Sequence, residues 1–404
     1  MSSYLYIRVI AFAPKGIGRS YRDKEVLFLG SLDERIRILC PFLCVYVSDR
    51  AMRIFHFSMN SETIIISSNV IAKDSSTRLN WLDWMKAIGI WLIIYGHFFS
   101  LFDRYVYVFN VPLFFIISGF LCKKEADSNI FWRKLWFNLI VPLLIICTIN
   151  YIIAGTKGFL TSDGNILPEN PFLFYGKLII GLHEAVGTFW FVYTLALLKI
   201  ILQYTRRVYI HILWLIIFLV FAYIINNNDV DIEVWGINPF AHAWSITNVF
   251  VSYPFFVIGH YMRKWKDKIS NYKANRYTFC WIVISLFLIF VCGHNHKYVY
   301  LYICGYGDSI ILYISGGLAG TIFIYFISKV LENIHWSWIT DISIGTTIIL
   351  GFHEHLISIF RHFFKTSSAV DLLLSICIVL LFVPIIRLCK SSIPIIMGKY
   401  RLKK

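Results

Sequence analysis

Three ionisable residues lie at the start of, or inside, a long apolar segment that reads as a membrane-spanning helix. They are Asp83, Lys86 and His97, in the run from Trp81 to His97. A charge at bilayer depth costs a few kcal/mol or more, so an ionisable residue there is a functional candidate by default. Because a neutral imidazole accepts a proton near physiological pH, His97 is a candidate general base.

The spacing of these residues places them along one side of the predicted helix. Lys86 and His97 are eleven residues apart, close to three full turns, so they lie about 16 Å apart along the helix axis. Asp83 lies on nearly the same face, one turn before Lys86. We interpret the three as a polar stripe that leads from the basic end of the helix to a histidine near its far end.

The composition is that of a membrane protein. Apolar residues make up 58% of the 404 residues and charged residues only 15%, whereas about 25% is usual for soluble proteins. The net charge of +15 does not indicate a nucleic-acid partner, because the basic residues recur between apolar runs. The nine Cys residues are scattered without a CxxC pair, so we expect neither a disulfide framework nor a zinc site.

The apolar segments predict an all-α integral membrane protein, a bundle of about ten transmembrane helices. Lys and Arg concentrate in the loops after even-numbered segments, among them Arg133 and Lys134 after the second and the cluster from Arg263 to Arg276 after the sixth. The positive-inside rule then predicts that both termini are cytoplasmic. The predicted spans are 82–102, 105–122, 135–154, 188–204, 208–226, 242–262, 277–293, 309–329, 341–360 and 368–389.

The chain divides into a membrane domain at 81–390, a cytoplasmic segment at 59–80, a basic cytoplasmic tail at 391–404 and an N-terminal part at 1–58. Residues 1–58 mix charges with apolar pieces too short to span a bilayer. They are either a small accessory segment or an artefact of start-site choice, with the true start at Met59. We favour the second interpretation.

Two sequence patterns carry a family resemblance. One is an Asp, a basic residue and a His eleven positions later in the first span (Asp83, Lys86 and His97), and the other is the run from Phe109 to Phe120, FNVPLFFIISGF. Together they resemble the integral-membrane acyltransferases of the acyltransferase-3 type, over roughly residues 78–390. Weaker matches are Trp190-Phe191, Phe255 to Gly259, and Ser343 to Gly345 followed by His353.

The resemblance implies an enzyme that moves an acyl group, expected to be acetyl, from acetyl-CoA or another acyl-CoA to a hydroxyl of a surface glycan or glycolipid. The expected setting is the inner membrane of a bacterial cell envelope. Two positions depart from the family: Lys86 stands where many members have Arg, and Asn110 stands where His is usual. Lys keeps the charge but cannot form a bidentate fork to phosphate.

Helix geometry places the candidate catalytic groups at one depth. With the N-terminus inside, His97 and His353 both lie about 18–22 Å from the cytoplasmic edge, and Asn110 lies near the same end of the second span. We expect His97 to act as general base, or alternatively as a transient acyl carrier. His353 and Asn110 are expected to contact the acceptor hydroxyl or the oxyanion of the reaction.

A donor site is expected at the opposite, cytoplasmic end. Lys86, Arg133 and Lys134 lie on that side and could hold the phosphates of CoA, with Asp83 orienting or neutralising Lys86. The run His353-Glu354-His355 resembles a fragment of a metal site but lacks the i, i+4 His pair of a zinc helix, so no metal is expected. Ser118-Gly119 is expected to allow close helix approach.

Two other functions stay open on the sequence. A glycolipid or solute transporter, or a flippase, also places ionisable residues at mid-membrane and often carries broken helices in two related halves. Pro112 could mark one such break, but the second half has no matching one. A membrane glycan polymerase would need a large polar outer loop, and the loop 155–187 is long but holds few basic or imidazole groups.

Overall fold

The computed structural model describes the membrane domain almost completely. The chain divides into two units, Met1–Ile65 and Ile66–Lys404, and every described residue belongs to the second. The predicted extension at 1–58 and residues 399–404 of the predicted tail therefore lie outside the described residues. The described residues are 78–99, 101–160, 170–227, 245–294, 298–364 and 367–398.

The described residues are helical, and they contain no strand beyond one isolated bridge between Tyr300 and Gly305. This confirms the all-α prediction. In chain order the helices are α2 (Asn80–Gly96), α3 (Asp103–Tyr107), α4 (Asn110–Leu121), α5 (Ser128–Leu135), α6 (Val141–Leu160), α7 (Pro171–Ile180), α8 (His183–Val186), α9 (Trp190–Tyr204), α10 (Val208–Asn227), α12 (Ile246–Met262), α13 (Lys266–Asn271), α14 (Arg276–His294), α15 (Ile310–Val330), α16 (Ser337–Ile344), α17 (Thr346–Phe363) and α18 (Ser368–Ser392).

Several of these helices could cross a membrane. Among the described residues seven helical segments are long and apolar enough, and an eighth counts if one bent pair is a single span. α2 and α12, with 17 residues each, fall just under that length. The chain is therefore a multi-pass membrane protein, while the count of ten spans and the cytoplasmic termini stay predictions.

The ninth predicted span, 341–360, is not the continuous helix that we expected. α16 and α17 meet at an angle of 86° across the break at Gly345. A Cβ atom at Gly345 would lie 2.4 Å from the side chain of Ile386 on α18. The chain therefore bends where only glycine leaves room for the neighbouring helix.

The close helix approach expected at Ser118-Gly119 is confirmed. A Cβ atom at Gly119 of α4 would lie 2.0 Å from the backbone oxygen of Phe256 on α12. The contact is reciprocal, because a Cβ atom at Gly259 would lie 2.1 Å from the backbone oxygen of Ile116. α4 and α12 therefore cross backbone to backbone, and their glycines have a packing role.

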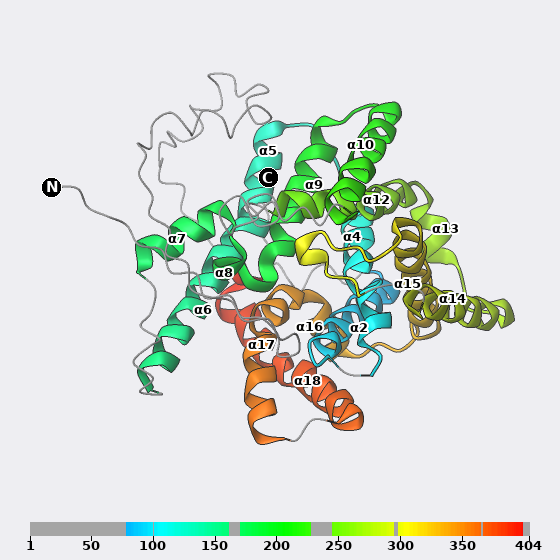
Figure 1. Ribbon diagram of the computed structural model, residues 1–404. Helices are drawn as coiled ribbons and strands as arrows, with labels where there is room; N and C mark the ends of the chain where they lie inside the picture. Colours follow the sequence, from blue (N-terminus) through cyan, green and yellow to red (C-terminus); the bar gives the residue numbers. More distant parts are fainter. Residues whose placement is uncertain are drawn as a thin grey trace, which may run out of the picture. The chain divides into compact units, whose positions relative to one another are not determined.

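Helix α2 packs against helices from both the N-terminal and the C-terminal parts of the described chain. It packs against α4 and α15 and also against α16, α17 and α18, and Figure 1 shows the blue α2 beside the orange α16. The largest apolar cluster includes Ile94 of α2, Ile146 of α6 and Ile349 of α17, all fully buried. This packing fixes the position of α2 relative to α17.

The C-terminal segment is only partly a tail. α18 continues to Ser392, and a short 3-10 helix, Pro394–Met397, follows it. Ile396 and Met397 are buried in the same apolar cluster as α2 and α17. A Cβ atom at Gly398 would lie 2.2 Å from the backbone oxygen of Asn138. The described part of this segment therefore belongs to the packed domain.

Candidate functional site

His97 is held in a tight turn at the end of α2. It caps the helix, and its backbone N–H donates to the carbonyl of Ile93 at 3.2 Å. Its own carbonyl accepts a hydrogen bond from Arg361 of α17 at 3.1 Å. Phe99, two residues on, has a φ of 49°, in the left-handed region that is strained for a bulky side chain. The turn directs the His97 imidazole away from the α2 axis and toward α17.

His353 lies on α17 with its ring fully buried. Its Nδ1 is 3.0 Å from the carbonyl oxygen of Leu350 and 3.1 Å from that of Ile349. Carbonyl oxygens only accept, so Nδ1 carries the proton and Nε2 of the neutral ring presents a lone pair. That Nε2 is buried and has no hydrogen-bond partner among the described residues.

The turn of α17 that carries His353 is fixed by neighbouring segments. Thr188 donates to the carbonyl of Leu350 at 2.8 Å, and Asn150 donates to that of Gly351 at 3.0 Å. A Cβ atom at Gly351 would lie 2.4 Å from the side chain of Ile146 on α6. The position of the His353 ring therefore depends on close packing between α17 and α6.

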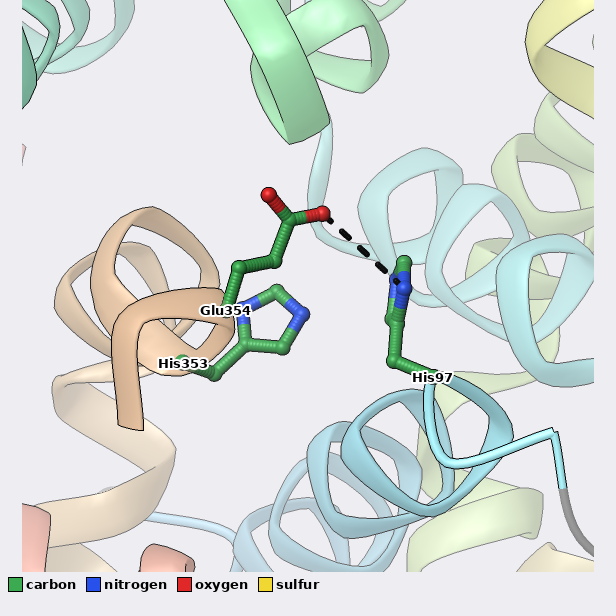
Figure 2. Close-up of side chains that lie close together, drawn as sticks. All are labelled: His97, His353 and Glu354. Atoms are coloured by element: carbon green, nitrogen blue, oxygen red, sulfur yellow. Dashed lines mark ion pairs between the residues drawn. The ribbon is translucent and has the colours of Figure 1, made fainter. Parts of the chain in front are cut away.

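The structure brings His97 and His353 together, although His353 does not lie on the continuous span from which its depth was predicted. Their ring centroids are 4.8 Å apart in an edge-on arrangement. Figure 2 shows Nε2 of His353 directed toward His97, with Glu354 reaching over the pair. Glu354 Oε1 is 3.9 Å from Nδ1 of His97. The cluster therefore places two imidazoles and a carboxylate close together, which are residue types that can transfer protons.

Glu354 is the group that sequence reasoning missed as a functional residue. Its position next to His353 was visible, but its contact with His97 depends on how α17 crosses α2. The Glu354 side chain is 57% exposed, whereas the ring of His353 beside it is fully buried. Aromatic rings line the neighbouring surface, because Tyr107 lies 6.5 Å from the ring of His97 and Phe99 stacks on Tyr107.

Asn110 lies beside the His97 turn. It is buried, and its Oδ1 accepts from the backbone N–H of Val111 at 2.8 Å. Its side-chain nitrogen would be 3.6 Å from a Cβ atom at Gly96. The Asn110 amide therefore lies beside Gly96, the residue before His97, and no described hydrogen bond joins Asn110 to His97.

Asp83 lies at the opposite end of α2, where its charge acts on Lys86 and its oxygens have further partners that we did not expect. It forms an ion pair with Arg78, whose second nitrogen donates to it at 2.8 Å. It also accepts from Ser343 Oγ of α16 at 2.6 Å. Lys86 forms no ion pair or hydrogen bond with any described residue and is half-buried. Asp83 thus connects the start of α2 to α16.

The other candidate donor-binding residues lie on α5. Lys134 pairs with Glu125 at 2.7 Å, and α5 is not among the described helices that pack closely against α2. Sequence reasoning overlooked Lys199, a half-buried lysine inside α9. α9 packs against α5 through Ala196. An isolated lysine inside a predicted span was the signal available in the sequence.

The comparisons identify one family. A family model described as an acyltransferase domain, of the acyltransferase-3 type, matches residues 79–388. The match covers most of the chain and includes Asp83, Lys86, His97 and His353. No curated protein and no solved structure matches the chain.

Proposed function

Since the chain belongs to the acyltransferase-3 family and is a membrane acyltransferase, we propose that it transfers an acetyl group from acetyl-CoA to a hydroxyl of a glycan or glycolipid. The proposed setting is a bacterial inner membrane, with the Lys86 end of α2 facing the cytoplasm. The observation that carries this proposal is the pair of imidazoles, His97 and His353, with an unpartnered buried nitrogen between them.

His97 is the proposed general base. With its Nδ1 directed at Glu354, its Nε2 is left to take the proton of the acceptor hydroxyl. The hydroxyl oxygen attacks the thioester carbonyl, the C–S bond breaks, and the departing thiolate receives the proton from His97. This step needs no metal ion.

His353 and Asn110 are the proposed positioning groups around the reacting atoms. Nε2 of His353 can only accept in the tautomer fixed by its backbone contacts, so it does not suit an oxyanion. It suits a neighbouring hydroxyl of the acceptor, because His97 takes the proton of the reacting one. The Asn110 amide has N–H donors that suit the developing oxyanion. Each group is thereby assigned by whether it donates or accepts.

Lys86 is the proposed contact for the phosphates of CoA, together with Arg133 and Lys134. A half-buried ammonium inside a membrane helix is costly unless an anion accompanies it. The polar stripe of α2 would then lead the pantetheine arm from Lys86 to His97, about 16 Å along the axis. Asp83, tied to Arg78 and Ser343, would keep α2 in place for this.

The test uses membranes from cells that express the protein, incubated with radiolabelled acetyl-CoA. Label is measured in the extracted glycan and glycolipid fraction for wild type, His97→Gln and His355→Gln. His355 is the matched control, since it lies two residues from His353 but bonds to Asn150. We expect label with wild type and His355→Gln, and labelling slower by about 10²–10⁴-fold with His97→Gln. Equal labelling with His97→Gln would contradict the proposal.

A further inference from the structure

The histidine cluster is also a set of metal-ligand atoms. One ligand atom from each of His97, His353 and Glu354 lies within 4.8 Å of the other two. Two imidazole nitrogens and a carboxylate oxygen form a common catalytic zinc ligand set, with bonds of about 2.0–2.2 Å. Tetrahedral ligands at such bonds are roughly 3.4 Å apart. A rotation of the exposed Glu354 side chain and a small shift of the His97 ring would bring the three ligand atoms to that separation.

His353 is already arranged as a metal ligand. A metal-bound histidine almost always donates its other ring N–H to a carboxylate or a backbone carbonyl, which fixes the tautomer and the ring orientation. Nδ1 of His353 has this partner in the carbonyls of Ile349 and Leu350. Its Nε2 is buried, unpartnered within the described residues and directed toward His97. A metal ion would satisfy that nitrogen.

We propose that His97, His353 and Glu354 bind one divalent transition-metal ion of the zinc class, and that the bound ion inhibits acyl transfer. The inhibition rests on the proposed function, because a metal on these nitrogens takes the lone pairs that would accept the hydroxyl proton. Binding itself does not depend on that function. The site therefore gives the enzyme a reversible off state set by the metal concentration.

The ligand set also predicts which ions bind. Imidazole suits Zn²⁺, Co²⁺, Ni²⁺ and Cu²⁺, with affinity rising along the series from Co²⁺ to Cu²⁺. Mg²⁺ and Ca²⁺ need six or more oxygen ligands or retained waters, and this cluster offers one carboxylate. Mg²⁺ at millimolar concentration should therefore neither occupy the site nor inhibit.

The sequence could not predict this site. His353 and His355 are two residues apart, which on a helix directs them to different sides, and His355 instead contacts Asn150 on α6 at 3.1 Å. The third ligand comes from α2, more than 250 positions earlier. Only the packing of α17 against α2 brings the three together.

The experiment is a Co²⁺ titration of the purified full-length protein in detergent, with an affinity tag that contains no histidine, after treatment with a chelator. We expect visible absorption of a four-coordinate Co²⁺ site that saturates at one ion per chain and is abolished by Zn²⁺. His353→Gln should abolish the absorption and Glu354→Gln should weaken binding at least tenfold. His355→Gln is the matched control and should titrate as wild type.

The absence of such absorption in well-folded wild type would overturn the proposal, as would an unchanged titration of Glu354→Gln. Because the Glu354 side chain is exposed, that variant should fold, and its elution and thermal midpoint verify this. Zn²⁺ should also inhibit labelling in proportion to occupancy, and a chelator should restore it. Metal binding that leaves acetyl transfer unchanged would overturn the proposal that the bound ion inhibits the enzyme. Binding by a protein that never transfers acetyl would leave the metal site standing and reject the proposed function.

Discussion

Both ends of α2 carry ionisable residues, but the two ends differ in how far the polar side chains have hydrogen-bond and ion-pair partners. At the Asp83 end the carboxylate has a guanidinium and a hydroxyl as partners, and these contacts tie α2 to α16. At the His97 end two imidazoles and a carboxylate lie close together, and a buried ring nitrogen has no partner in the described residues. A satisfied polar network holds helices together, whereas an unsatisfied one has capacity left for a substrate or an ion.

Replacement of His97 should cause the largest loss of acetyl transfer among the variants that compare the two ends of α2. Loss of a general base reduces turnover by about 10²–10⁴-fold, so His97→Gln should transfer acetyl at that reduced rate. The thermal midpoint of the purified protein should stay near that of wild type, because the imidazole has no strong hydrogen bond to lose. A variant with low activity and an equally low midpoint would show that His97 has a packing role like that of Asp83.

Replacement of Asp83 should have the reverse effect, a loss of stability with a much smaller loss of activity. Asp83→Ala leaves Arg78 and Ser343 without their partner, and removal of one member of a buried pair costs about 3–5 kcal/mol. Since the Arg78 side chain is 33% exposed, we expect about 3 kcal/mol, measured as a lower midpoint of thermal unfolding in detergent. Activity per folded molecule should fall far less than with His97→Gln.

The matched control for this change is Asp341 on α16. It is buried and pairs with Arg387 and Lys390, far from α2 in sequence, so Asp341→Ala should cost a comparable amount of stability. A folded Asp83→Ala protein that has lost all activity would contradict the structural role of Asp83 and join it to the reactive site.

A smaller effect is expected at Gly351, which connects packing to the histidine cluster. A Cβ atom there would lie 2.4 Å from the Ile146 side chain and 3.1 Å from Phe189, so Gly351→Ala should shift the His353 turn. A displacement near 1 Å can cost up to about 10²-fold, and we expect about tenfold in kcat. Gly176→Ala is the control, because nothing lies within 4 Å of its Cβ position. Equal rates for both variants would contradict the proposed positioning role of His353.

The smallest effect is expected at Lys86. A charge-assisted contact to phosphate contributes about 1.5–3 kcal/mol, and Arg133 and Lys134 would retain part of the attraction. Lys86→Met should therefore raise the KM for acetyl-CoA by about tenfold and leave kcat nearly unchanged. Lys199→Met is the comparison variant, because Lys199 is also a half-buried lysine inside a helix. An unchanged KM in Lys86→Met would remove Lys86 from the donor site.

The helices could be predicted from the sequence, but not the contacts between them. Apolar runs define the spans, whereas the depth predicted for His353 counted helical rise along one continuous span from Asp341, and the break at Gly345 interrupts that span. The contact of Glu354 with His97 depends on the 86° bend at Gly345, which a hydropathy pattern does not encode. The sequence predicted that Asp83 orients or neutralises Lys86, three residues along the helix, and the charge of Asp83 does act on Lys86. The ion pair of Asp83 with Arg78, which precedes the helix, was not predicted.

The measurement that tests the central claim most directly is a double-mutant cycle between His97 and His353. Acetyl transfer is measured for wild type, His97→Gln, His353→Gln and the double variant, each with a thermal midpoint to establish folding. If the two imidazoles act on the same proton transfer, the double variant should be no slower than the slower single variant. Losses that multiply would show that the two histidines act independently, and would contradict a single reactive site.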